Sequence, residues 1–146
     1  MTLKALGWTV VALLSGCVSV AQQRPENMAF VTVYSGNGLF SGFVEKTVYA
    51  DDRVVIASSD EGGRNQKKQT GQGKPGLYAK VAALVAATGP GVQVAAPGAE
   101  NLCLDYGQDR VTAMPHIAGF ATASASCPEP AMSAFSQQVL AAISLP

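Results

Sequence analysis

Charge is scarce in this sequence, and neither sign is in excess. Only 14% of the 146 residues are charged, and ten basic side chains balance ten acidic ones, so the formal net charge is zero. A protein whose main partner is nucleic acid needs a clustered positive field, which this balance argues against. The hydrophobic fraction of 48% is enough for the core of one folded domain and is unlike that of a disordered chain.

Residues that bind metals or activate nucleophiles are also scarce. Histidine occurs once, at His116, and the three cysteines form no CxxC pair. A zinc site needs several such ligands, and the glycines at 36–42 and 73–76 complete neither a dinucleotide loop nor a phosphate loop. We therefore expect no metal and no cofactor. An exported hydrolase using His116 with Asp105 or Asp109 and a serine stays open as an alternative, although no Gly-x-Ser-x-Gly elbow is present.

Long apolar runs are absent as well. None reaches the roughly 20 residues that a membrane-spanning helix requires. The run Ala5–Leu14 follows Lys4 and is only about ten residues long, which is typical of the apolar region of a signal peptide. The sequence therefore predicts export across a membrane.

The end of this run is more specific. Leu14-Ser15-Gly16-Cys17 resembles the lipobox of bacterial lipoproteins, in which a branched apolar residue and two small residues precede the cysteine that is lipidated. The resemblance implies removal of residues 1–16, acylation of Cys17 by a fatty acid such as palmitate, and anchoring on the periplasmic side of a membrane. Val18, in place of an aspartate after the cysteine, implies the outer membrane rather than the inner one.

A second cleavage site is also present. Ser19-Val20-Ala21 fits the small-x-small rule of ordinary signal peptidase. Cleavage after Ala21 would discard Cys17 and give a soluble periplasmic or secreted protein.

Export also bears on the redox state of the two other cysteines. Cys103 and Cys127 remain as an even pair in an oxidising compartment, where a disulfide is the usual outcome. Closing a loop of about 25 residues would stabilise the fold by roughly 3 kcal/mol in the chain-entropy description. A free thiol nucleophile or two metal ligands are the alternatives.

The remaining sequence predicts one domain over residues 28–146, joined to the anchor by a polar tether that makes up the rest of residues 17–27. Period-two patterns bounded by turn residues predict strands. Asp51-Asp52 suits a tight turn between two of them, and the polar segment 59–76 is either a long hairpin or a loop. The expected strands are 28–34, 41–50, 53–58, 102–106, 110–114 and 120–126.

Two helices complete the prediction. Pro75 suits the start of the first helix, and Gly89 with Pro90 predicts its end. Pro128 and Pro130 suit the start of the second. Apolar residues recur at helical spacing in both, so we expect an α+β fold: an antiparallel sheet of about five to six strands with two helices on one face, with two strands-then-helix halves as one arrangement. The stripes are Leu77, Val81, Leu84, Val85 and Thr88 in the first helix, and Met132, Phe135, Val139 and Ile143 in the second.

Two stretches are candidate binding surfaces. The loop 34–43 carries Phe40 and Phe43, which are either exposed aromatic anchors or core residues. The second stretch is the polar segment 59–76, which carries a basic cluster. This cluster would contact anionic lipid, polysaccharide or an acidic partner, or would simply be solvated. Its members are Arg64, Lys67, Lys68 and Lys74.

The densest group of carboxylates is explained by turns rather than by acid–base chemistry or calcium binding. Its members are Asp51, Asp52, Asp60 and Glu61.

The sequence as a whole favours a lipid-anchored cell-envelope protein, most simply a non-catalytic binding or inhibitor-like module with an envelope protein as partner. A purely structural lipoprotein without a small partner is a further option.

Overall fold

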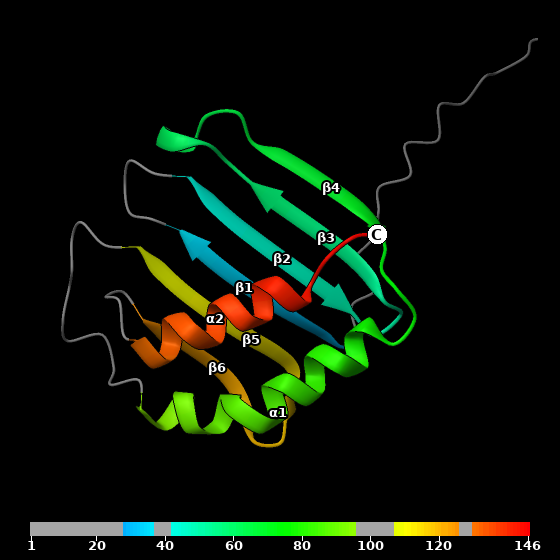
Figure 1. Ribbon diagram of the computed structural model, residues 1–146, viewed down its shortest axis with the longest axis vertical. Helices are drawn as coiled ribbons and strands as arrows, with labels where there is room; N and C mark the ends of the chain where they lie inside the picture. The colour runs from blue at the N-terminus through cyan, green and yellow to red at the C-terminus, as the bar shows by residue number, and fades with distance from the viewer. Residues whose placement is uncertain (1–27, 37–41, 96–106, 126–129) are drawn as a thin grey trace, which may run out of the picture.

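The computed structural model describes residues 28–36, 42–95, 107–125 and 130–146. They form a six-stranded antiparallel sheet with the strand order β4-β3-β2-β1-β5-β6 (Figure 1). The predicted α+β fold is thus confirmed. The elements are β1 (Phe30–Gly36), β2 (Phe43–Tyr49), β3 (Arg53–Ser58), the short 3₁₀ helix η1 (Glu61–Gly63), β4 (Lys67–Gln72), α1 (Leu77–Ala95), β5 (Gln108–Ile117), β6 (Phe120–Ala125) and α2 (Pro130–Ala142).

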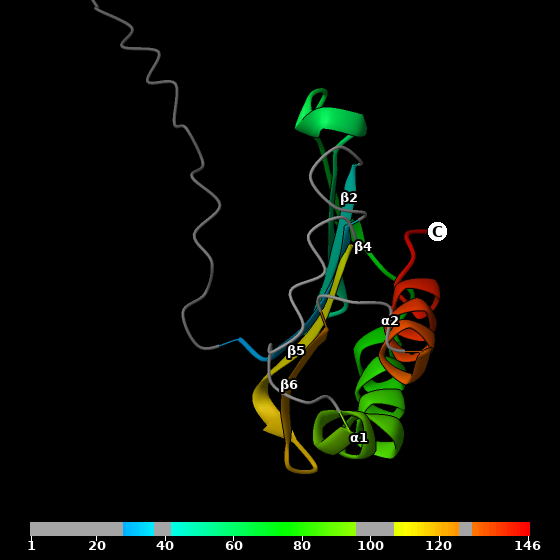
Figure 2. The ribbon, with the colours of Figure 1, turned by 90° about the vertical axis from the view of Figure 1, so that its left-hand side faces the viewer.

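Both helices pack on the same face of the sheet, as Figure 2 shows in side view. Strand residues alternate between the two faces, so one set of valines from β1, β2, β3 and β5 is buried toward the helices. The predicted stripe of α2 is buried against them, as are Leu77, Val81 and Val85 of α1. The strand valines in this core are Val31, Val33, Val48, Val54 and Val111.

No described helix or strand covers the other face of the sheet, which we call the open face (Figure 2). Its middle is a row of hydroxyl side chains in register across neighbouring strands. The Oγ1 atoms of Thr32 and Thr47 lie 2.8 Å apart, and Thr122 Oγ1 donates to Thr112 Oγ1 over 3.2 Å. Cross-strand hydroxyl pairs of this kind stabilise a sheet, and Thr47 itself is buried, with 4% of its surface exposed.

The predicted turn at Asp51-Asp52 joins β2 to β3 and also fixes α1. Asp52 has φ 62°, a left-handed conformation that aspartate tolerates better than most residues. Its carboxylate accepts hydrogen bonds from the main-chain N–H groups of Gly76 and Tyr78, each at 2.7 Å. Gly76 directly precedes the helix and Tyr78 lies in its first turn, and main-chain N–H groups at a helix start have no intrahelical acceptor. A strand turn therefore caps a helix that begins 25 residues later.

The predicted end of α1 at Gly89-Pro90 is wrong, because the helix continues through both residues to Ala95. A proline inside a helix costs about 3 kcal/mol. Here the additional turn buries Val92 and brings Gln93 to the edge of the sheet. Gln93 Oε1 accepts the main-chain N–H groups of Ala121 and Thr122 in β6. These tertiary contacts offset the local penalty.

The structure decides the open alternative for the polar segment and corrects both ends of strand β5. The polar segment contains a regular strand, β4, so the hairpin alternative holds. Strand β5 was expected over residues 110–114, but it begins earlier, at Gln108, and continues through Pro115 to Ile117. Proline is tolerated there because the pairing with β1 ends at Met114 and the β5–β6 register is irregular between Thr112 and Ile117. The expected strand 102–106 lies outside the described residues.

Candidate functional site

The chain enters the sheet at one end and carries most of its candidate binding residues at the other. The described chain reaches the sheet at Phe30, beside the Asp51-Asp52 turn, where Ala50 N–H donates to the carbonyl of Ala29 over 2.9 Å. We call the opposite end of the sheet the distal end. The register places there the residues Gly36, Phe43, Ser58, Lys67 and Gln108.

The structure divides the predicted basic cluster. Arg64, Lys67 and Lys68 lie at the distal end, after η1 and at the start of β4. Lys74 lies at the other end, where β4 has run back to the Asp51-Asp52 turn and Gly73 N–H donates to the carbonyl of Asp52 over 2.8 Å. Lys74 is therefore not part of a distal surface.

Phe43 lies on the open face at the distal end and is half-buried. Its ring stacks on Tyr34 with a centroid distance of 5.7 Å and an interplanar angle of 19°. The Arg110 guanidinium lies 5.6 Å from the centroid of the Tyr34 ring. Phe43 thus belongs to a surface group of two aromatic rings and a cation, whereas Phe40 lies outside the described residues.

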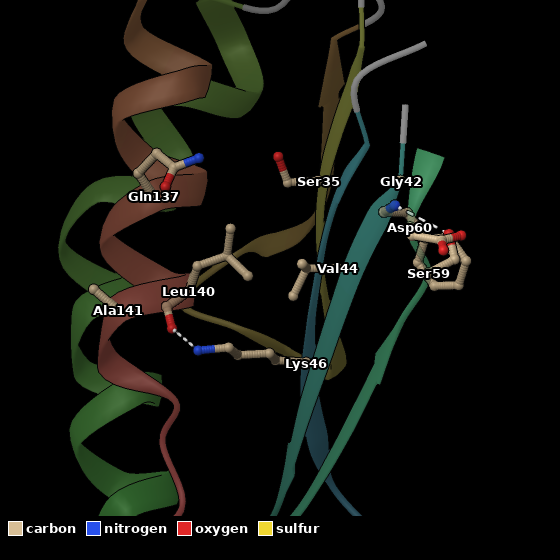
Figure 3. Close-up of a pocket in the computed structure, with 10 residues that line it drawn as sticks. Ser35, Gly42, Val44, Lys46, Ser59, Asp60, Gln137, Leu140 and Ala141 are labelled. Atoms are coloured by element: carbon tan, nitrogen blue, oxygen red, sulfur yellow. Dashed lines mark hydrogen bonds between the residues drawn. The ribbon is translucent and has the colours of Figure 1, made fainter. Parts of the chain in front are cut away.

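A hollow of about 810 Å³ opens at the distal end between α2 and the first strands (Figure 3). Leu140 and Gln137 of α2 face Val44 and Lys46 of β2 across it. Val44 stays 36% exposed because α2 does not cover this part of the sheet. The lining residues are Ser35, Gly42, Phe43, Val44, Lys46, Ser59, Asp60, Gln137, Leu140 and Ala141.

Lys46 fixes α2 over the sheet. Its Nζ donates to the main-chain carbonyls of Leu140 and Ile143, both at 2.8 Å. These carbonyls lie at the C-terminus of α2, which carries partial negative charge and lacks intrahelical donors. Partial burial of the ammonium lowers the pKa of Lys46 below its ordinary value. A lysine that alternates with Val44 and Val48 on the core-facing side of a strand was the sequence signal for this role.

Lys46→Met keeps the apolar stem and removes both hydrogen bonds to the end of α2, so we expect a loss of about 1 kcal/mol in the free energy of unfolding. Lys80→Met, at an exposed lysine of α1, is the matched control and should change little. Between the lowered pKa and 10.5 the unfolded chain holds more protons, so wild type should gain stability relative to Lys46→Met as the pH rises. Urea unfolding at several pH values measures both effects; a flat difference would contradict the burial of the ammonium.

His116 is exposed near the end of β5 that lies away from the distal end. Asp109 lies seven residues earlier on the same strand, which separates the two by about 23 Å at the usual strand rise. Asp105 lies outside the described residues. No described side chain forms a hydrogen bond with His116, and the described residues contain no group of three or more metal-ligand side chains.

The acidic residues do not form one group. Asp51 and Asp52 occupy the β2–β3 turn, and Asp60 accepts a hydrogen bond from Asn65 Nδ2 at the distal end. Their prediction as turn residues is confirmed for the Asp51-Asp52 turn, and each of the three carboxylates accepts a hydrogen bond.

The three cysteines, Cys17, Cys103 and Cys127, lie outside the described residues, so lipidation and the disulfide stay predictions. Among the helices that the structure describes, none has the length and apolar character needed to cross a bilayer. No protein-family model matches the chain, and comparison with curated proteins finds no match.

Proposed function

We propose that this chain is a lipid-anchored protein of the bacterial cell envelope, most simply of the outer membrane, whose folded domain is a non-catalytic binding module. Acylation at Cys17 would hold the N-terminus at the membrane. The tether of residues 17–27 spans at most about 35–40 Å when extended, which keeps the domain close to the membrane surface.

The observation that carries the proposal is the opposition of the two ends of the sheet. The tether leads to β1 at Phe30. The hollow and the Tyr34–Phe43 pair lie at the distal end, together with the cations Arg64, Lys67 and Lys68. A tethered domain that binds a partner away from the membrane needs its binding surface on the side opposite its anchor. Aromatic residues and arginine are enriched at surfaces that bind proteins, and both occur at this end of the sheet.

A photo-crosslinking amino acid tests this arrangement in living cells. Placed at Arg64 in the full-length protein, it should yield a discrete adduct with an envelope protein. At the exposed Lys80 of α1, the matched control, it should yield much less of that adduct. Absence of adducts at Arg64, or the same adducts in equal yield at Lys80, would contradict a distal binding surface.

A further inference from the structure

Strand β4 leaves one edge of the sheet open. Within the described ranges it pairs only with β3, and every residue from Lys67 to Gln72 is exposed except the half-buried Gly71. The β3–β4 pairing is regular over six residue pairs, without a bulge or a proline. An edge of this kind presents a row of main-chain N–H and C=O groups to a further strand.

The opposite edge of the sheet is protected. Gln93, from the end of α1, accepts the N–H groups of Ala121 and Thr122 in β6 at 2.9 and 3.3 Å. The β5–β6 register is also irregular. The fold therefore leaves β4, rather than β6, suited to strand addition.

The open edge is basic on both of its faces. Lys67 pairs with Ser58 on the helix-covered side, Lys68 pairs with Ala57 on the open face, and Arg64 precedes both. Within the residues that the structure places, none of these three cations forms an ion pair. The nearby Asp60 carboxylate accepts its hydrogen bond from Asn65 instead. Lysines on an edge disfavour pairing with a second copy of the same edge, and they favour acidic side chains on an added strand.

The other end of the edge offers an apolar contact. Leu145 lies over Gly71, where an added Cβ atom would come within 2.8 Å of Leu145 Cδ2. An added strand would place a side chain next to Gly71 on the same face, within reach of the half-exposed Leu145. The edge thus combines cations at one end with one partly exposed apolar side chain, Leu145, at the other.

We propose that β4 accepts an extended segment of a partner protein as a seventh strand of the sheet. Acidic side chains of that segment lie beside Lys67 and Lys68, and an apolar side chain contacts Leu145. Main-chain hydrogen bonds provide the attachment, and the charge pattern selects the partner. This inference rests on the proposed binding function and names the class of partner.

Synthetic peptides and the whole mature chain in detergent micelles test the proposal. The probe has about ten residues, a usual strand length, and alternates valine and threonine around two central glutamates. It should bind and slow hydrogen exchange of the β4 amides. Lys67→Glu/Lys68→Glu should weaken binding at least about tenfold, and Lys80→Glu should leave it unchanged. In an added strand, alternate N–H groups point toward β4 and away from it. N-methylation of the set that points toward β4 should abolish binding, and N-methylation of the other set should not.

Three results would overturn the proposal. The glutamate peptide fails to bind; or both N-methylated sets bind as well as the parent, which shows charge attraction without strand addition; or the β4 amides become protected as the protein alone is concentrated, which assigns the edge to a second copy. The Arg64 crosslink is measured in cells and does not depend on these peptides. Its failure would remove the distal binding function, whereas peptide failure alone would remove only strand addition.

Discussion

Replacing Asp52 by alanine should lower the free energy of unfolding by about 2–4 kcal/mol. The carboxylate accepts two hydrogen bonds of 2.7 Å, one from Gly76 just before α1 and one from Tyr78 in its first turn. It also places negative charge at the positive end of that helix. Alanine removes both acceptors and also tolerates φ 62° less well than aspartate. Because the turn and the helix belong to distant parts of the sequence, the loss should appear as weakened packing of α1 on the sheet.

Two further variants separate the causes of this loss. Asp52→Asn keeps the tolerance for positive φ and one acceptor oxygen, so it should cost about 1 kcal/mol. Asp51→Ala removes a neighbouring exposed carboxylate. Among the described residues this carboxylate accepts one hydrogen bond, from the Arg53 N–H, and lies 3.9 Å from the Arg53 guanidinium, so the change should cost less than about 1 kcal/mol. Denaturant unfolding measures all three, and equal losses for Asp51→Ala and Asp52→Ala would refute the capping role.

Replacement by alanine should have opposite effects on stability at two glycines of α1, Gly89 and Gly91. At Gly89 an added Cβ atom would lie 2.7 Å from Phe120 Cδ2, and the Phe120 ring is held edge-on against Phe135 at 5.8 Å. Overpacking of this kind costs about 1–3 kcal/mol, more than alanine gains in helix propensity. At Gly91 an added Cβ atom would point into open space, so alanine should stabilise the protein by about 0.5–1 kcal/mol.

Thermal unfolding of Gly89→Ala and Gly91→Ala tests whether α1 passes through Gly89 and Pro90. If the helix ended at Gly89, as its sequence alone indicates, Gly91→Ala would gain nothing from helix propensity. A fall in the unfolding temperature for Gly89→Ala, together with a rise for Gly91→Ala, is the result that the continuous helix requires.

Elements whose determinants are local were predictable from the sequence. The meander β1–β3 follows from period-two patterns and the Asp51-Asp52 turn, and the buried stripe of α2 follows from the spacing of its apolar residues. The C-terminal turn of α1 was not predictable, because the contacts of Val92 and Gln93 with the sheet override a local Gly-Pro signal. Strand β4 is polar on both faces since it is an edge, so it carries no hydrophobic period.

The candidate site was predictable only in its residue types. Of the predicted basic cluster, Arg64, Lys67 and Lys68 lie at the distal end, whereas the length of β4 takes Lys74 to the other end of the sheet. Their role in binding stays a prediction. The hollow depends on where α2 stops covering the strands, which is a tertiary property. The one sequence signal for the place where α2 stops covering the sheet was Lys46, a charged residue on the core-facing side of β2.

Metabolic labelling with a fatty-acid analogue tests the central claim, that the chain is exported and lipid-anchored, most directly. Cells expressing the wild-type protein should incorporate label into this chain, and Cys17→Ala should abolish that label while the Cys103→Ala/Cys127→Ala variant retains it. Label that is absent from wild type, or that persists in Cys17→Ala, would contradict the lipid anchor and with it the orientation of the distal end away from the membrane.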